Sequence, residues 1–208
     1  ELEEAMKKKI FVRGPVLSQS GYGEQSRFAL RALRSREDLF DIYVQPIPWG
    51  QTGWIWEESE FREWLDSKIT VTQILMQQKQ LQPDISLQIT IPNEFQKMCP
   101  VNIGYTAGIE TTKVAPEWIA KCNEIVDRLI VVSNHSKKVF ETTKYNVKDQ
   151  QGNQHEGWGL QKPVYAVNYP VRKTVPEPLE IEFETTNNFL VVSQWAIRKN
   201  IENTVKWF

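Results

Sequence analysis

The chain has 208 residues, of which 40% are apolar and 25% charged, a balance typical of a globular protein with one domain or slightly more. The formal net charge is −1, so no overall basic character favours a nucleic-acid partner. No apolar run approaches the roughly 20 residues of a membrane helix, and the two cysteines, Cys99 and Cys122, indicate a reducing, cytoplasmic location.

The first predicted unit is a strand, a glycine-containing loop and a helix. Lys9–Arg13 predicts the strand, and Gln25–Arg34 predicts the helix. A loop that carries Gly21 and Gly23 and opens a helix can cradle a phosphate, because the first N–H groups of the helix are unpaired. A plain tight turn explains the same two glycines equally well. The inward stripe of the helix is predicted to consist of Phe28, Ala29, Ala32 and Leu33.

A second strand, Asp41–Ile47, leads into a loop rich in tryptophan. Indole faces stack well on sugar rings, so Trp49, Trp54 and Trp56 are candidates for a carbohydrate platform. The competing interpretation is that these side chains cover the edge of a core.

Two helices and a strand are predicted next. The helices cover Glu57–Leu65 and Ile69–Leu81, and Ile85–Ile91 alternates as a strand does. The glutamines of this stretch are interpreted as a solvated helix face: Gln77, Gln78, Gln80 and Gln82.

The run from Val101 to Phe140 determines the predicted fold class. A strand at Val101–Tyr105 is followed by a helix that starts at Pro116, a residue favoured in the first helical turn. The apolar face of that helix is predicted to hold Trp118, Ile119, Cys122, Ile125 and Val126. A strand at Leu129–Val132 then precedes a helix capped by Ser133 or Asn134. This βαβα order predicts an α/β fold with a Rossmann-like parallel sheet flanked by helices, and ligands at the carboxyl ends of its strands.

The last third of the chain is less regular. Tyr145–Lys162 is polar and glycine-rich, which fits either a hairpin or a mobile loop, and Val164–Asn168 is a further strand. Phe189–Ser193 and Asn200–Phe208 predict a strand and a helix that begin a second, truncated domain. Neither histidine has partners at metal-ligand spacing, and His135 is interpreted as a first-turn helix residue and not a catalyst.

Three blocks of sequence resemble the family 4 glycosyltransferases, which have the two-lobed GT-B fold. The first contains Gly14-Pro15 and Ser20-Gly21-Tyr22-Gly23. The second is Glu110-Thr111-Thr112 with the following Pro116-Glu117-Trp118 and Asp127–Ser133, which is similar to the family's E-T-x-x-x-P-x-x-W … V-P-S run. The third, Phe189–Phe208, is similar to the opening of the family's second lobe, with Trp195, Arg198, Lys199 and Asn200 in its W-x-x-R-K-N turn.

The resemblance implies transfer of a sugar from a nucleotide-sugar donor to a glycan or lipid-linked acceptor, with retained anomeric configuration and no metal or other cofactor. It implies an acceptor-side domain over residues 6–175, a linker over 176–188 and the incomplete donor-binding domain over 189–208. The donor diphosphate is expected at Gly21, Tyr22 and Gly23 together with Arg198 and Lys199, because cations there neutralise the leaving group. Glu110 is the catalytic candidate, and Trp49, Trp54 and Trp56 are the acceptor-binding candidates. Nothing in the sequence indicates membrane association or an oligomeric state.

Two alternatives stay open. Gln194 stands where many family members have an arginine, which favours a non-catalytic GT-B-like module that binds a glycan or a protein. A dinucleotide-binding domain is disfavoured because the G-x-G-x-x-G pattern is absent.

Overall fold

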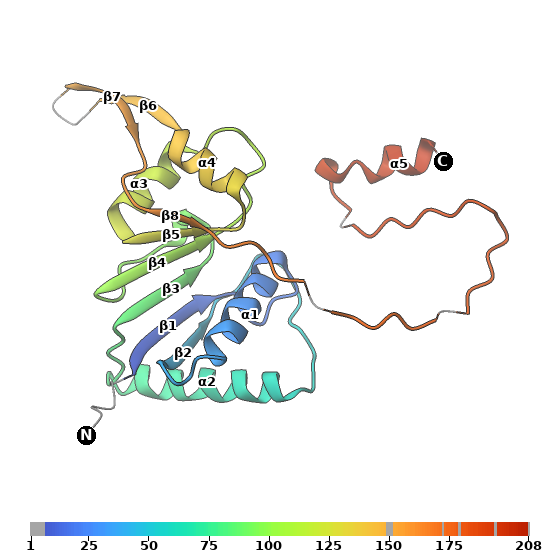
Figure 1. Cartoon of the computed structure of the whole chain (residues 1–208), viewed down its shortest axis with the longest axis horizontal. Coiled ribbons are helices and arrows are strands. Elements are labelled where there is room, and N and C mark those ends of the chain that lie inside the picture. The colour runs from blue at the N-terminus through green and yellow to red at the C-terminus, as the bar shows by residue number, and fades with distance from the viewer. Residues whose placement is uncertain (1–6, 149–151, 172, 179, 194, 208) are drawn as a thin grey trace. The chain divides into compact units, whose positions relative to one another are not determined.

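A computed structural model describes residues 7–148, 152–171, 173–178, 180–193 and 195–207 (Figure 1). The chain divides into two compact units, Glu1–Val171 and Arg172–Phe208. The first unit is an α/β fold with a parallel sheet flanked by helices. The sheet consists of β1 (Lys8–Gly14), β2 (Phe40–Pro46), β3 (Ile85–Ile89), β4 (Val101–Thr106), β5 (Arg128–Val131) and β8 (Val164–Ala166). Its helices are α1 (Gly21–Arg34), α2 (Glu60–Gln77), α3 (Pro116–Ile125) and α4 (Asn134–Thr142), with a short 3-10 turn η1 (Pro92–Glu94).

The strand order is β2-β1-β3-β4-β5-β8, and every neighbouring pair is parallel, which confirms the Rossmann-like arrangement. Each predicted sheet strand is present, with ends shifted by one or two residues. The chain passes from β1 to its neighbour β2 in one direction across the sheet, and from β3 to its neighbour β4 in the opposite direction. The loops after β1 and β3 therefore diverge at the carboxyl edge, which is the usual place for a ligand in such sheets.

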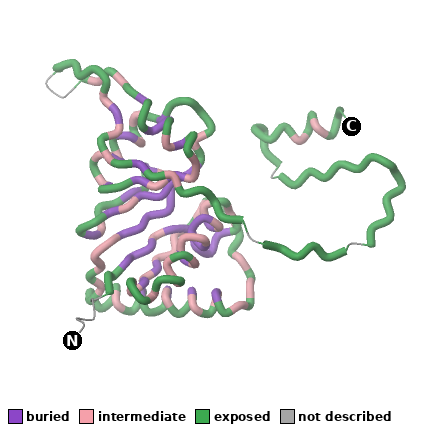
Figure 2. The backbone as a smooth tube through the Cα atoms, in the orientation of Figure 1, coloured by how far each residue is buried: buried purple, intermediate pink, exposed green. Residues whose placement is uncertain are grey.

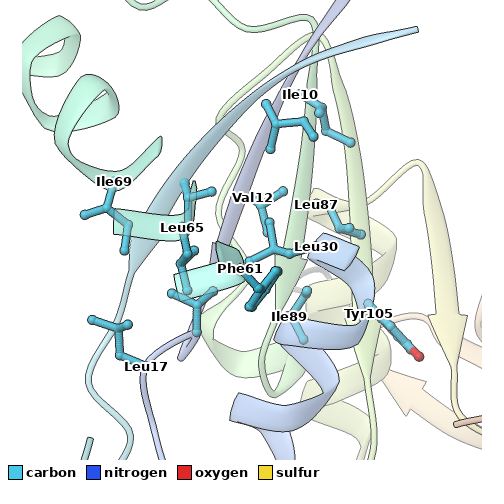
Figure 3. Packing of buried hydrophobic residues seen from close by; sticks show 13 residues of the cluster. Ile10, Val12, Leu17, Leu30, Phe61, Leu65, Ile69, Leu87, Ile89 and Tyr105 are labelled. Atoms are coloured by element: carbon cyan, nitrogen blue, oxygen red, sulfur yellow. The ribbon is translucent and has the colours of Figure 1, made fainter. Parts of the chain in front are cut away.

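The helix α1 is buried on a face that overlaps only partly with the one predicted. Its buried residues are Gly23, Gln25, Ser26, Arg27 and Leu30, and Figure 3 shows Leu30 beside Val12 and Leu87 of the sheet. The predicted stripe is only partly right: Ala29 and Leu33 are half-buried and pack against the core, whereas Ala32 is exposed and Phe28 is half-buried along an apolar hollow of about 390 Å³.

Close backbone packing explains why polar residues of α1 face inward. A Cβ on Gly14 would lie 2.8 Å from Ser26 Oγ, so the helix and β1 approach each other through small residues. The guanidinium of Arg27 is buried and donates hydrogen bonds to Val16 O (3.0 Å) and Ser18 O (2.9 Å). These bonds compensate the burial of a charge that the apolar pattern cannot reveal.

A single helix, α2, replaces the two helices predicted over 57–65 and 69–81. It begins after Ser59, whose hydroxyl accepts from Arg62 N–H at 3.2 Å, and it lies along the outer edge of β2 (Figure 1). Thr72 Oγ1 of α2 accepts a hydrogen bond from Val44 N–H of β2 at 2.8 Å. The helix therefore pairs a backbone group that an edge strand would otherwise leave open.

The second hydrophobic cluster covers the other half of the sheet. Gly104 of β4 lies under Phe95, because a Cβ at this glycine would be only 2.5 Å from the Phe95 ring. As predicted, Pro116 opens α3 and the predicted apolar residues of that helix pack into the cluster. Of the two candidate caps for α4, Ser133 is the one used, with its Oγ 3.0 Å from Ser136 N.

The strand β3 is buried on both faces (Figure 2), although its alternating sequence suggests one solvated face. The loop after η1 covers the polar side: Gln88 donates to Gln96 O at 2.6 Å and accepts from Gln96 N at 2.9 Å. Ser86 donates to Asn102 Oδ1 at 2.8 Å. Polar side chains that pair with one another or with backbone can be buried at little cost.

Residues 144–148 and 154–159 pair as the two strands of a hairpin, which decides between the two predicted possibilities. The antiparallel strands β6 (Lys144–Lys148) and β7 (Gln154–Gly159) make a separate two-stranded sheet. Tyr145 and Trp158 pack against the second cluster and anchor the hairpin.

The second unit contains η2 (Ile197–Lys199) and α5 (Ile201–Trp207), so the predicted helix over 200–208 is confirmed for its described residues. The predicted strand at Phe189–Ser193 is wrong: these residues form no strand in the described structure, and all of them are exposed. A strand exists by backbone pairing with a neighbouring strand, and neither sheet of the described ranges includes this segment. Gln194 lies outside the described residues.

Candidate functional site

Tyr22 joins the start of α1 to the loop after β4. Its hydroxyl lies 2.9 Å from Thr106 Oγ1, donates to Ala107 O at 3.0 Å and accepts from Ala107 N–H at 3.0 Å. Burial raises the pKa of Tyr22, so the hydroxyl stays neutral and keeps both donor and acceptor capacity. The glycine block and the loop that leads to Glu110 are thus adjacent at the carboxyl edge of the sheet.

The tryptophan loop is attached to the same place. The Trp49 ring lies 4.5 Å from the Tyr22 ring, centroid to centroid. Backbone bonds from Gln19 N to Gly53 O and from Ile55 N to Leu17 O, each 2.8 Å, pair this loop with the segment that precedes α1.

The tryptophans divide into packed and exposed groups. Trp49 is half-buried on Tyr22, so it covers core as the competing interpretation expected, and Trp64 of α2 stacks on Phe61. Trp54 and Trp56 are 69% and 89% exposed. Two indoles therefore remain accessible beside the start of α1, where a flat apolar ligand face could stack.

The two glycines at the start of α1 have different structural roles. A Cβ on Gly23 would lie 2.1 Å from Ser18 O, so close packing alone requires glycine there. A Cβ on Gly21 would meet nothing within 4 Å. Ser20 already accepts from Gly23 N–H at 3.0 Å, which leaves the N–H groups of Gly21 and Tyr22 as those of the first turn without an intrahelical acceptor.

Glu110 is exposed in the loop after β4. It lies two residues beyond Gly108, whose φ of +82° is readily adopted by glycine. His135 is in the first turn of α4, as predicted, and its Nε2 lies 3.1 Å from Thr111 O. The imidazole thus contacts the backbone of the loop that carries Glu110.

An additional polar cluster at the divergence of β1 and β3 was not among the predicted site residues. Arg13 Nη1 donates to Glu94 O at 3.1 Å, and the Thr90 hydroxyl is hydrogen-bonded to the Glu94 carboxylate. Burial lowers the pKa of Arg13, and the charge of Glu94 opposes that shift. Arg13 is the last but one residue of β1, Thr90 directly follows β3, and Glu94 lies in η1 just beyond it, so the carboxyl-edge rule applied to β1 and β3 would have found them.

Tyr169 is a second site residue that sequence reasoning missed. Its hydroxyl donates to Gln25 Oε1 at 3.0 Å, 144 residues earlier in the chain. Burial raises the pKa of Tyr169 to about 12, and the nearby Tyr105 and Tyr22 add to the shift. The residues after β8 therefore lie against α1, close to the tyrosine that joins α1 to β4.

Arg198 and Lys199 belong to the second unit, where they lie in η2 on exposed surface. Asn200 follows in the left-handed region with φ +52° and leads into α5. The expected meeting of these cations with Gly21 stays a prediction.

Neither a metal cluster nor a membrane helix is found in the described ranges. No three His, Cys, Asp or Glu side chains gather there as a metal site would require. None of the described helices has the length and apolar character to cross a membrane.

These features define a doubly wound α/β domain whose carboxyl edge brings together a glycine-bearing helix start, two exposed indoles and the loop of Glu110. No family model, curated protein or solved structure matches the chain.

Proposed function

We propose that the first unit is the acceptor-side lobe of a retaining glycosyltransferase, which transfers a sugar from a nucleotide-sugar donor to a glycan or lipid-linked acceptor. The observation that supports this most is the convergence at one sheet edge of the α1 start, the tryptophan loop and the loop of Glu110. These are three separate stretches of sequence, and two of them carry the resemblance to the family.

The donor diphosphate is proposed to approach the backbone of Gly21 and Tyr22. Gly21 is exposed with open space above its Cα, and the first-turn N–H groups present the positive end of the helix dipole. Lys199 and Arg198 are proposed to neutralise the charge that develops on the leaving phosphate, a role that preorganised cations fill well.

The acceptor is proposed to stack on Trp54 and Trp56, which offer accessible indole faces. In this proposal Glu110 accepts a hydrogen bond from an acceptor hydroxyl and so favours its attack as general base.

The test is a transfer assay with the full natural protein that carries this sequence, using a panel of nucleotide-sugars. Lys199→Ala should lower kcat on the order of 10²-fold, as is typical when one group that stabilises a developing oxyanion is lost. Lys206→Ala is the matched control, because Lys206 lies on α5 and pairs with Glu202 at 2.6 Å. Absence of turnover with every nucleotide-sugar, or an unchanged kcat in Lys199→Ala, would contradict the proposal.

A non-catalytic glycan-binding module is the second candidate. The exposure of Trp54 and Trp56 favours it, since stacking platforms need no reaction. Glycan binding by the same protein that is lost in Trp54→Ala, without transfer from any donor, would identify this function instead.

A further inference from the structure

A hollow with a mixed polar and apolar lining lies where the end of β2 faces the second half of α2. Its volume is about 430 Å³, within the range of roughly 300–1,000 Å³ common for small-molecule pockets. The strand contributes Val44, Gln45 and Pro46, and the helix contributes Thr72, Gln73, Met76 and Gln77. The hollow thus differs from the carboxyl-edge site in both its elements and its residues.

Gln45 is the lining residue of this hollow whose side chain has a buried polar atom without a partner among the described residues. That atom is Oε1. A buried polar atom without a partner costs about 1–3 kcal/mol, which calls for an explanation. Thr72 cannot satisfy Gln45, since its hydroxyl already accepts from Val44 N–H at 2.8 Å and donates to Lys68 O at 2.6 Å. The terminal amide torsion of glutamine is soft, so rotation about it can turn the amide of Gln45 toward a ligand in the hollow.

The lining selects an uncharged ligand with hydroxyl groups. None of the side chains that line the hollow is ionisable, so an ion would lose its hydration there without a counter-charge. An amide offers one accepting and one donating end, and a hydroxyl complements either end because it both donates and accepts. Pro46 and Met76 supply accessible apolar contacts beside the three amides. A sugar ring combines these two requirements, since it carries C–H faces and a rim of hydroxyls.

We propose that this hollow is a binding site for a neutral sugar unit, held by the amides of Gln45, Gln73 and Gln77. Gln73 and Gln77, which are exposed on α2, are then ligand-binding groups. The interpretation as a solvated face holds for Gln78, Gln80 and Gln82. The site needs neither a nucleotide-sugar donor nor the second unit, so it stands apart from the proposed transfer reaction.

The test measures binding of methyl glucoside, methyl galactoside, methyl mannoside and N-acetylglucosamine to the 208-residue chain, by saturation-transfer NMR followed by titration. At least one sugar should bind, and Gln45→Leu should lower the affinity for that sugar on the order of tenfold. Without sugar, the same variant should unfold at a higher urea concentration than the wild type, because a buried unpaired acceptor has been removed.

A second variant protects the test against misfolding of Gln45→Leu. Gln73 and Gln77 are exposed on α2, where alanine is the best helix former, so the double alanine variant should keep the fold and still bind the sugar less tightly. Gln82→Ala is the control, because Gln82 is exposed and does not line the hollow. Binding of none of the four sugars, or unchanged affinity in both glutamine variants, would overturn the proposal. Binding that Trp54→Ala removes and the glutamine variants do not would place the sugar on the tryptophan loop and overturn it as well.

Discussion

Substitution of Gly23 by alanine should destabilise the first unit by about 3 kcal/mol, at the upper end of what overpacking usually costs. The added Cβ would lie 2.1 Å from Ser18 O and 3.0 Å from Pro15 O. Both contacts are backbone atoms, so no change of side-chain rotamer relieves them, and the helix or the preceding loop must move. Ser18 O also accepts from Arg27 Nη1 at 2.9 Å, so the movement strains a buried charged hydrogen bond.

The matched control is Gly21→Ala, two residues earlier in the same helical turn. A Cβ at Gly21 meets nothing within 4 Å, and alanine is the better helix former, so stability should be unchanged or raised by up to about 1 kcal/mol. If the diphosphate approaches this backbone as proposed, Gly21→Ala should nevertheless raise the KM for the donor.

Urea unfolding followed by tryptophan fluorescence gives the change in unfolding free energy for each of the two variants, provided that the slope of free energy against urea stays constant. A Gly23→Ala variant within about 0.5 kcal/mol of the wild type, which is the range of innocuous surface changes, would refute the close packing of α1 on the loop before it.

Four further outcomes are expected. Tyr22→Phe should cost about 1–3 kcal/mol in urea unfolding, because Ala107 N–H loses its 3.0 Å acceptor, and a neutral result would show that water replaces the hydroxyl. Burial raises the pKa of the Cys122 thiol to about 12, so a chromogenic disulfide reagent should leave it unmodified at about pH 8 until the chain unfolds. The pKa of Tyr169 is about 12 in the folded state, against about 10 in an unfolded chain. Its contribution to stability is therefore complete below about pH 10 and is lost as the pH rises towards 12. Tyr169→Phe should make the fall in stability over this pH range less steep. Trp54→Ala should change stability by less than about 0.5 kcal/mol, because the indole is 69% exposed, so a large loss would show that it packs a core.

Local chemistry was enough to predict the features that neighbouring residues decide. Pro116 begins a helix because its missing N–H is not needed in a first turn, and Ser133 caps the next helix through a hydroxyl three residues from its partner. The strand positions followed in the same way from short apolar runs, and with them the parallel sheet.

Features that depend on distant partners were missed. The inward face of α1 depends on Gly14, which leaves room for Ser26, and on backbone oxygens that accept hydrogen bonds from Arg27. Neither contact can be predicted from the helical periodicity of apolar residues. Phe189–Ser193 has the composition of a strand, yet a strand also needs a partner, and composition says nothing about one. Within the site, Tyr169 and Gln25 lie 144 residues apart, beyond the reach of any local motif.

The bond between Thr72 and Val44 bears on how copies of this chain can associate. With a helix along β2, an incoming strand from another molecule finds one of the edge amides there already occupied. The opposite edge offers only the three residues of β8, too short a template for stable pairing between chains. Association of the domain through the edges of its six-stranded sheet is therefore disfavoured at both ends.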